Sequence, residues 1–141
     1  MKRSLFTILA LLVAVSMVLA ACGPKPVEEK PYAGETVTVF GAAQEEQVKR
    51  FEESMIPFEE RTGIDVVYEG SADFETIALV RAEAGDPFDI YNFPQPGLMA
   101  DFARSGFLVD LGQFLDDDYM KQQYTQSWID LGTVDGMLYG V

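Results

Sequence analysis

Apolar residues along this chain change their spacing in a regular way after residue 35. Short β-rich stretches, in which apolar residues alternate with polar ones or run together, predict strands at 36–40, 64–68 and 88–91. The stretch after each strand carries apolar residues three and four positions apart, which predicts helices at about 43–61, 73–84 and 96–104. Strands that alternate with helices in this way predict a parallel βαβ sheet with right-handed crossovers, which is an α/β layer fold.

Several residues mark where these elements should begin and end. Pro57 lies inside the first predicted helix, and we expect it to kink or restart that helix because proline has no N–H to donate. Ser71 and Asp73 are suited to cap the amino end of the second helix. Pro96 is suited to the first position of the third helix. The helices are therefore expected to start directly after the loops that follow the strands.

The pattern changes after residue 106. The predicted elements here are a short helix capped by the aspartates at 116–118, another turn at 127–131 and a hairpin at 133–139 around Asp135 and Gly136. The last residue, Val141, falls within the second arm of this hairpin. We therefore expect the chain to be a fragment of a longer protein, with an incomplete sheet.

Three polar loops follow the predicted strands, at 41–45, 70–74 and 92–97. Parallel α/β sheets bind ligands in such loops, at the carboxyl ends of their strands. The polar side chains of these loops include carboxylates, amides and a hydroxyl, and we take five of them as candidate ligand-binding residues: Glu45, Ser71, Asp73, Asn92 and Gln95. Sugars are bound by such mixtures, because carboxylates and amides form paired hydrogen bonds with adjacent hydroxyls while aromatic rings cover the C–H face.

Some of these residues also have a simpler explanation. Capping of a helix explains Ser71 and Asp73 as well as ligand contact does, and the two roles are compatible. The neighbouring Phe74 and Phe93 are better explained by core packing than by stacking on a ligand. Within "FPQPG" (93–97), a helix that starts at the second proline and a glycine that leaves room for a ligand would hold Gln95 at the ligand face.

The first 21 residues differ from the rest. A basic start is followed by an uncharged apolar stretch, and small residues precede Cys22. This order resembles a bacterial lipoprotein signal, which implies cleavage before Cys22 and a diacylglyceryl thioether on its sulfur. A transmembrane helix is disfavoured because the apolar stretch is shorter than the ~20 residues that cross a bilayer. The expected parts are a signal peptide at 1–21, a lipidated and proline-rich tether at 22–34 and a globular part at 35–141.

The charge of the chain limits its partners. The chain carries 10 Lys and Arg against 23 Asp and Glu, a net charge of -13 at pH 7, and the predicted signal contains two of the basic residues. Such an acidic surface repels phosphate, so we expect no nucleic acid partner. It also disfavours docking on anionic lipid, so the lipid on Cys22 is the expected contact with the membrane. The protein is then exported and anchored on the outer face of the cell membrane.

The chain lacks the residues of several kinds of active site. It has no histidine, and Cys22 is its only cysteine, which excludes a zinc site or a Cys/His or Ser/His nucleophile pair within this chain. No nucleotide-binding glycine motif occurs, so neither a cofactor nor a metal is expected. A glycosidase needs two facing carboxylates, and Glu45 with Asp73 keeps an exported carbohydrate-active enzyme open as an alternative. A surface adhesin or scaffold is another.

The strand at 36–41 with the acidic helix after it, and three further segments, together resemble the family 1 extracellular solute-binding proteins of carbohydrate ABC importers, in particular their α-glucoside-type branch. The three segments are "ERTGIDVVYEGSADFE" (60–75), "AGDPFDIYNFPQPGLMADFARSGFLVDL" (84–111) and "WIDLGTVDGMLYGV" (128–141). The resemblance implies a type II periplasmic-binding-protein fold, in which two hinged lobes close on a sugar that is then delivered to permease subunits. It implies that 35–141 is the incomplete amino-terminal lobe. It also implies that Glu45 and the turns at 70–75 and 93–97 line the cleft between the lobes, with no catalysis.

Overall fold

The computed structural model describes residues 30–141, and its centre is a three-stranded parallel sheet. The strands are β1 (Thr36–Gly41), β2 (Asp65–Gly70) and β3 (Ile90–Asn92), in the order β2-β1-β3. The α/β prediction and its parallel sheet are thus confirmed. The predictions for the signal, for most of the tether and for Cys22 lie outside the described residues.

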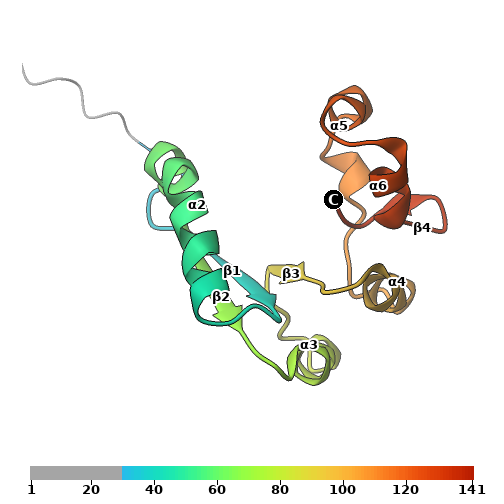
Figure 1. Cartoon of the computed structure of the whole chain (residues 1–141), viewed down its shortest axis with the longest axis horizontal. Helices are drawn as coiled ribbons and strands as arrows, with labels where there is room; N and C mark the ends of the chain where they lie inside the picture. Colours follow the sequence, from blue (N-terminus) through green and yellow to red (C-terminus); the bar gives the residue numbers. More distant parts are fainter. Residues whose placement is uncertain (1–29) are drawn as a thin grey trace, which may run out of the picture.

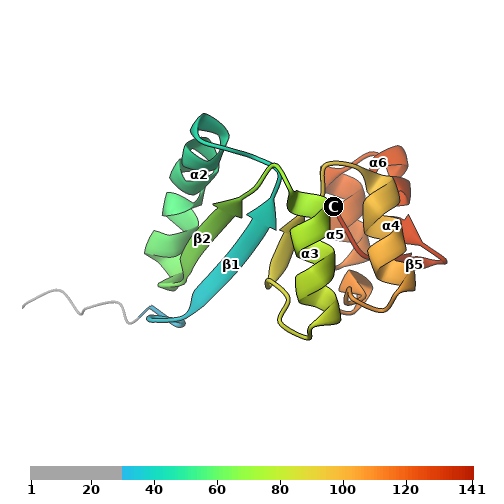
Figure 2. The ribbon, with the colours of Figure 1, turned by 90° about the horizontal axis from the view of Figure 1, so that it is seen from below.

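Helices cover the two faces of this sheet: α2 (Glu46–Thr62), α3 (Phe74–Glu83) and α4 (Pro96–Arg104). Neighbouring residues of β1 point to opposite faces, as the pleat of a strand requires. Val39 packs with β2 and with α2, whereas Phe40 packs with α3 and with Phe88. One helix therefore lies on one face and α3 on the other, and the views in Figures 1 and 2 agree with this arrangement.

The larger core cluster is aromatic. The Phe40 ring stacks on Phe88, with centroids 4.3 Å apart and planes 9° from parallel, and it lies 5.2 Å from Phe74. Phe102 of α4 and the partly buried Tyr91 extend this cluster and connect it to α4. Aromatic side chains bury large apolar areas, so this cluster joins α3, α4 and the sheet into one unit.

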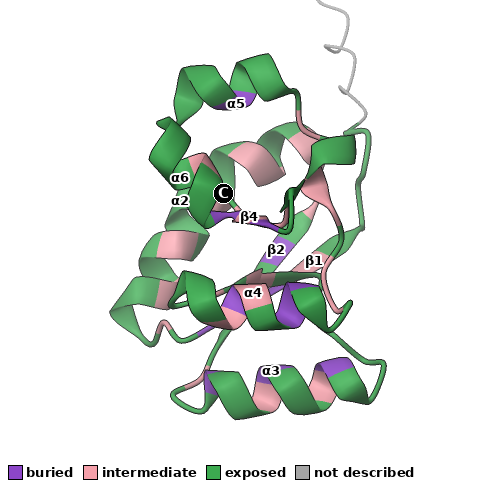
Figure 3. Ribbon diagram, turned by 90° about the vertical axis from the view of Figure 1, so that its right-hand side faces the viewer, coloured by how far each residue is buried: buried purple, intermediate pink, exposed green. Residues whose placement is uncertain are grey.

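A second group of elements follows α4: η2 (Leu111–Gln113), α5 (Asp117–Gln123), α6 (Gln126–Leu131), β4 (Thr133–Val134) and β5 (Met137–Leu138). Figure 1 shows α5, α6 and β4 at the end of the molecule that is far from α2. Asp116 caps α5 by accepting the N–H of Tyr119, as predicted. Apart from the buried Met120, α5 is exposed along most of its surface (Figure 3).

The predicted hairpin is also confirmed. β4 and β5 pair antiparallel, and the two turn residues, Asp135 and Gly136, both have positive φ angles, of 51° and 85°. This is the combination that a two-residue type I′ turn requires. Val134 packs with Met99 and Ala103, so the hairpin is attached to α4 rather than to the parallel sheet.

The structure excludes a restart of the helix at Pro57, and it places the start of the third strand later than predicted. Pro57 lies inside α2 but does not restart the helix, which is continuous over seventeen residues. Its partly buried face, which includes Phe51, Met55 and Phe58, packs on the sheet before and after the proline and offsets the missing hydrogen bond. The third strand begins at Ile90 rather than at residue 88.

The late start of β3 has a specific cause. A carboxylate oxygen of Asp89 accepts the backbone N–H of Thr38 at 2.8 Å and its hydroxyl at 2.7 Å. The Thr38 hydroxyl in turn accepts the N–H of Asp89 at 3.2 Å. A side chain therefore takes the position that a backbone carbonyl of β3 would occupy, and the two strands pair only beyond it.

The first described residues are attached to the amino-terminal end of the sheet. Tyr32 donates its N–H to the Thr62 carbonyl at 2.9 Å, and Asp65 donates its own to Glu35 at 2.8 Å. The Lys30 ammonium donates to the carbonyl of Glu59 at 3.3 Å. This segment thus lies at the opposite end of β1 from Gly41. Across residues 30–141, no helix has the length and hydropathy needed to cross a membrane.

We expect Asp89→Asn to lower the free energy of unfolding at pH 7 by about 1 kcal/mol, because the carboxylate is exposed and its charged hydrogen bonds are partly screened by water. The hydrogen bond from the Thr38 side chain lowers the pKa of Asp89 most, and the hydrogen bond from the Thr38 backbone lowers it further. This stabilisation is complete above the unfolded-state pKa of about 4 and is lost as the pH falls through the lower folded-state pKa.

Urea unfolding of wild type and Asp89→Asn between pH 7 and pH 2 measures this effect. The difference between the two proteins should narrow progressively as the medium becomes acidic. Glu52→Gln, on the exposed side of α2, is the matched control and should change little at any pH. A difference between wild type and Asp89→Asn that is constant across this range would contradict the assignment.

Candidate functional site

The three parallel strands end at one level. Gly41, the last residue of β1, is the register partner of both Gly70 and Asn92, the last residues of β2 and β3. Neighbouring strands lie about 4.8 Å apart, so Gly70 and Asn92 are separated by roughly 10 Å. The strand arrows in Figure 2 point to this end, where α3 begins. We call the ends of the three strands and the loops 42–45, 71–73 and 93–95 the carboxyl edge.

All five candidate residues lie on the carboxyl edge, because each ends a strand or belongs to one of its loops. Glu45, Asp73, Asn92 and Gln95 are exposed, and Ser71 is half-buried. The N–H of Ser71 donates to the carbonyl of Gly41 at 3.0 Å, which ties the second loop to the end of the central strand. An area this small can present carboxylate, amide and hydroxyl groups to one ligand.

The capping roles differ from the prediction. The Ser71 hydroxyl accepts the N–H of Asp73 at 3.1 Å, so serine shapes the turn before α3. Asp73 occupies the N-cap position, but its side chain makes no capping hydrogen bond. Its backbone has φ -92° and ψ 28°, which is not the extended conformation of a capping aspartate. The exposed Asp73 carboxylate therefore makes no hydrogen bond to the first turn of α3.

Gln95 is connected to a residue that the sequence did not single out as a site residue. Its Nε2 donates to the Glu75 carboxylate at 3.3 Å. Glu75 lies in the first turn of α3, where the helix dipole favours an anion. Pro96 occupies the first turn of α4, as predicted, so the backbone around Gln95 is restricted. The third loop is thus joined to the start of α3 through one side-chain pair.

The hydroxyl of Tyr68 reaches the carboxyl edge from the face of the sheet that α2 covers. Tyr68 is buried on the α2 face, with its ring 4.9 Å from that of Phe51. Its hydroxyl donates to Oδ1 of Asn92 at 3.3 Å. Burial raises the pKa of Tyr68, and a backbone hydrogen bond from Ala43 opposes the rise, so the phenol stays protonated at neutral pH and remains a donor. Alternation along β2 indicates that Tyr68 is buried, but not that its hydroxyl reaches the edge.

Two glycines permit these close contacts. A Cβ at Gly41 would collide with the Tyr68 hydroxyl and would lie 3.0 Å from the Cβ of Asn92. A Cβ at Gly70 would collide with the carbonyl of Ala43 in the first loop. Each position therefore needs a residue without a side chain, because a backbone or side-chain oxygen occupies the space.

Glu45 has a strained backbone. Its φ is 44° and its ψ is -108°, a region that residues with a side chain rarely adopt. Such a conformation costs on the order of 1–3 kcal/mol and persists where the surrounding structure requires it. The Glu45 carbonyl accepts the N–H of Lys49 at 3.0 Å and so begins α2. This backbone conformation turns the chain from the first loop into α2, and the Glu45 carboxylate stays exposed.

The aromatic residues near the edge belong mainly to the core. Phe74 is 1% exposed and cannot stack on a ligand. Tyr91 and Phe93 are half-buried and pack against Phe74 and Phe102 in edge-on or tilted contacts. The preference for core packing at positions 74 and 93 is confirmed. Hydrogen-bonding groups therefore dominate the exposed part of this edge.

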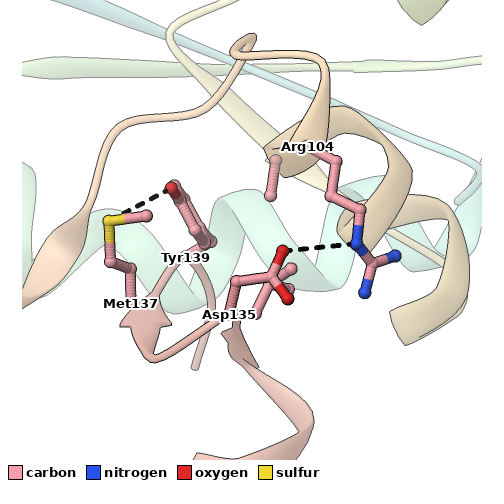
Figure 4. Close-up of a pocket in the computed structure, with 6 residues that line it drawn as sticks. Arg104, Asp135, Met137 and Tyr139 are labelled. Atoms are coloured by element: carbon pink, nitrogen blue, oxygen red, sulfur yellow. Dashed lines mark hydrogen bonds and ion pairs between the residues drawn. The ribbon is translucent and has the colours of Figure 1, made fainter.

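A shallow depression of about 230 Å³ lies elsewhere, between the end of α4 and the β4–β5 hairpin (Figure 4). The Arg104 Nε lies 3.4 Å from an Asp135 carboxylate oxygen, and the Tyr139 hydroxyl lies 3.6 Å from the sulfur of Met137. Its charged groups are thus paired with each other. Since α4 starts at the carboxyl edge and ends at this depression, the two are separate. Within residues 30–141, no three acidic or other metal-binding side chains gather closely enough to hold an ion.

A model of the family described as bacterial extracellular solute-binding proteins matches residues 33–141. The chain is 50% identical over 105 residues to the osmoprotective compounds-binding protein GgtB of Synechocystis sp., covering 74% of this chain and 25% of that protein. It is 38% identical over 107 residues to the alpha-glucosides-binding periplasmic protein AglE of Rhizobium meliloti, covering 73% and 23%. The chain thus spans about a quarter of the length of these curated relatives.

Solved structures share the fold. The maltotriose binding protein of Thermus thermophilus matches with a TM-score of 0.61 at 20% identity, covering 74% of this chain and 28% of that one. A solute-binding protein of an ABC transporter from Thermotoga lettingae, bound with alpha-D-tagatose, matches with a TM-score of 0.65 at 22% identity, covering 77% and 28%. The predicted type II periplasmic-binding-protein fold is confirmed by these likenesses.

Two glycine substitutions test the packing of the carboxyl edge. Gly41→Ala should lower the free energy of unfolding by about 1–3 kcal/mol, because the new methyl group must displace Tyr68 or Asn92. Gly97→Ala is the matched control: no atom lies within 4 Å of its Cβ position, and alanine is favoured over glycine inside α4. It should raise the free energy of unfolding by about 0.5–1 kcal/mol. Urea unfolding measures both, and equal effects of the two changes would be inconsistent with this packing.

Proposed function

This chain belongs to the bacterial extracellular solute-binding proteins, and from that membership we propose that it captures a sugar and delivers it to the permease subunits of an ABC importer. In this proposal residues 35–141 are part of the amino-terminal lobe of a two-lobed receptor. The carboxyl edge forms one wall of the cleft, and closure of the lobes about a hinge holds the ligand without covalent chemistry.

The observation that carries this proposal is the common level of the three strand ends. Their register brings the loops of Glu45, Asp73 and Gln95 to one edge of the sheet. The edge offers carboxylates, which accept hydrogen bonds, and amides, which both donate and accept. Sugar hydroxyls also donate and accept, so neighbouring hydroxyls of one ring can be matched by such a set. A charged ligand is not required by any of these groups.

An α-glucoside is the ligand class that we propose. One curated relative is named for binding alpha-glucosides, and one solved neighbour is named for maltotriose, which it holds. The net charge of -13 disfavours an anionic ligand, because an acidic surface repels anions. Both curated relatives are named as binding proteins, so we propose that this protein, too, binds its sugar without converting it.

Membrane attachment through Cys22 completes the proposal. The sequence before this cysteine has the order of a lipoprotein signal, and the short tether after it leads to Lys30. The segment from Lys30 to Glu35 is attached at the amino-terminal end of the sheet, away from the carboxyl edge. A lipid on Cys22 would therefore hold the protein on the outer face of the membrane without occupying the binding edge.

Metabolic labelling with an alkyne fatty acid tests the anchor. The wild-type protein should incorporate the label and remain with the membrane fraction, whereas Cys22→Ser should lose the label, because it lacks the thiol that forms the thioether. Lys25→Ala, a change in the same tether, is the control and should be labelled like wild type. Labelling that is equal in Cys22→Ser and wild type would exclude this attachment.

Thermal unfolding of the full-length gene product with maltotriose, sucrose, trehalose and raffinose tests the sugar. A ligand at a hundred times its Kd adds about 2.7 kcal/mol of stability, so the melting temperature should rise with at least one of them. Gln95→Ala and Asp73→Ala should each weaken that sugar about tenfold, since each removes a hydrogen bond made in the closed cleft.

Asp118→Ala, on the exposed α5, is the control and should keep the wild-type affinity. Unchanged affinity in both Gln95→Ala and Asp73→Ala would contradict the site, even if the sugar binds. Release of monosaccharides from maltotriose or raffinose by the purified protein would instead favour the carbohydrate-active enzyme, and no shift with any sugar would favour the adhesin or scaffold.

A further inference from the structure

We propose that Tyr68 is a positioning residue of the binding edge, which holds the Asn92 side chain so that its Nδ2 faces the ligand. This inference rests on the proposed function, because it assumes that a ligand binds at the carboxyl edge. It assigns a role in recognition to a buried residue that contacts no ligand. The orientation of Asn92 then determines which kind of ligand atom it recognises.

The position of the Tyr68 hydroxyl carries the inference. Its ring belongs to the α2-side cluster, 6% exposed and packed on Phe51, so the side chain has little freedom. Its oxygen lies 3.3 Å from Oδ1 of Asn92. It occupies the space that a Cβ at Gly41 would need, so the missing side chain of Gly41 makes room for it. A rigid donor from β2 therefore meets an exposed amide at the end of β3, across the end of β1.

The contact determines which half of the amide is available. A primary amide has one oxygen that accepts and one nitrogen that donates two hydrogens. Tyr68 donates to Oδ1 of Asn92, which orients the amide and takes one of the two acceptor positions of that oxygen. The Nδ2 group is left for the ligand, and the partner there must be an acceptor, such as the ring oxygen, the glycosidic oxygen or a hydroxyl oxygen of a sugar.

The neighbouring amide has the opposite arrangement. The Nε2 of Gln95 donates one of its two hydrogens to Glu75, so its Oε1 keeps both acceptor positions for a ligand hydroxyl. The carboxyl edge thus presents a donor at the end of β3 and an acceptor in the loop that follows. A ligand with an acceptor oxygen and a hydroxyl at matching separation satisfies both, which is the pattern of adjacent oxygens on a pyranose ring.

A role in packing alone predicts a different outcome for Tyr68→Phe. The phenylalanine ring fills the same space, so a packing role would leave the affinity for a sugar unchanged. A positioning role predicts weaker binding in a protein that remains folded, because the amide can then rotate and offer its oxygen to the ligand. Tyr119→Phe, which removes an exposed hydroxyl on α5, is the matched control.

The test is a double-mutant cycle on the full-length gene product, titrated calorimetrically with whichever sugar of the thermal panel stabilises it most. Asn92→Ala should raise Kd about tenfold and Tyr68→Phe about three- to tenfold. The double variant should bind about as weakly as Asn92→Ala alone, because Tyr68 acts only through Asn92. Asn92→Asp, which replaces the two donors by an acceptor, should bind at least as weakly as Asn92→Ala.

A second measurement does not need a sugar. The two Nδ2 proton resonances of Asn92, identified by their loss in Asn92→Ala, should shift in Tyr68→Phe and stay in place in Tyr119→Phe. Weak binding by Asn92→Ala together with wild-type affinity in Tyr68→Phe would overturn the positioning role and leave the binding edge intact. Additive effects, or unshifted resonances, would also overturn it. A wild-type protein that binds no panel sugar overturns the proposed function instead, and the resonances then decide the Tyr68 contact alone.

Discussion

Parallel pairing of β1 with both of its neighbours is the constraint on which the rest of the structure depends. The register gives Gly41 two partners, Gly70 and Asn92, so every loop that leaves the sheet toward a helix starts at the same level. The crossover from β1 to β2 and the crossover from β2 to β3 run in opposite directions along the sheet. With the common right-handed sense they place α2 on one face and α3 on the other. The polar edge is thus a consequence of strand pairing and needs no additional element to assemble it.

Recognition at such an edge depends on order more than on the number of contacts. A hydrogen bond exchanged with water contributes only about 1 kcal/mol, and immobilising a free side chain costs a similar amount. Side chains that are held before the ligand arrives avoid this cost. Asn92 is held by Tyr68 and Gln95 by Glu75, and both partners belong to regular elements of the fold.

The order of elements and the location of the edge could be predicted from the sequence, because both follow from local apolar spacing and from the parallel topology. The contacts within the edge could not. Tyr68 appears as an ordinary buried position of β2, and only the register with Gly41 shows where its hydroxyl ends. The start of β3 was misplaced for a related reason: Asp89 caps Thr38 across fifty-one positions, which no local pattern records. At Pro57, packing outweighed a local preference against helix.

A force that pulls on the chain at Lys30 acts first on the amino-terminal end of the sheet. The hydrogen bonds of Tyr32 with Thr62 and of Asp65 with Glu35 resist it there. The six residues of β1 place Gly41 about 20 Å from that point, at 3.3 Å per residue. Tension along the proposed membrane tether would therefore act at one end of the sheet, while the proposed ligand-binding groups lie at the other. In the proposed lipid-anchored receptor, movement on the anchor would therefore load the amino-terminal end of the sheet and not the carboxyl edge.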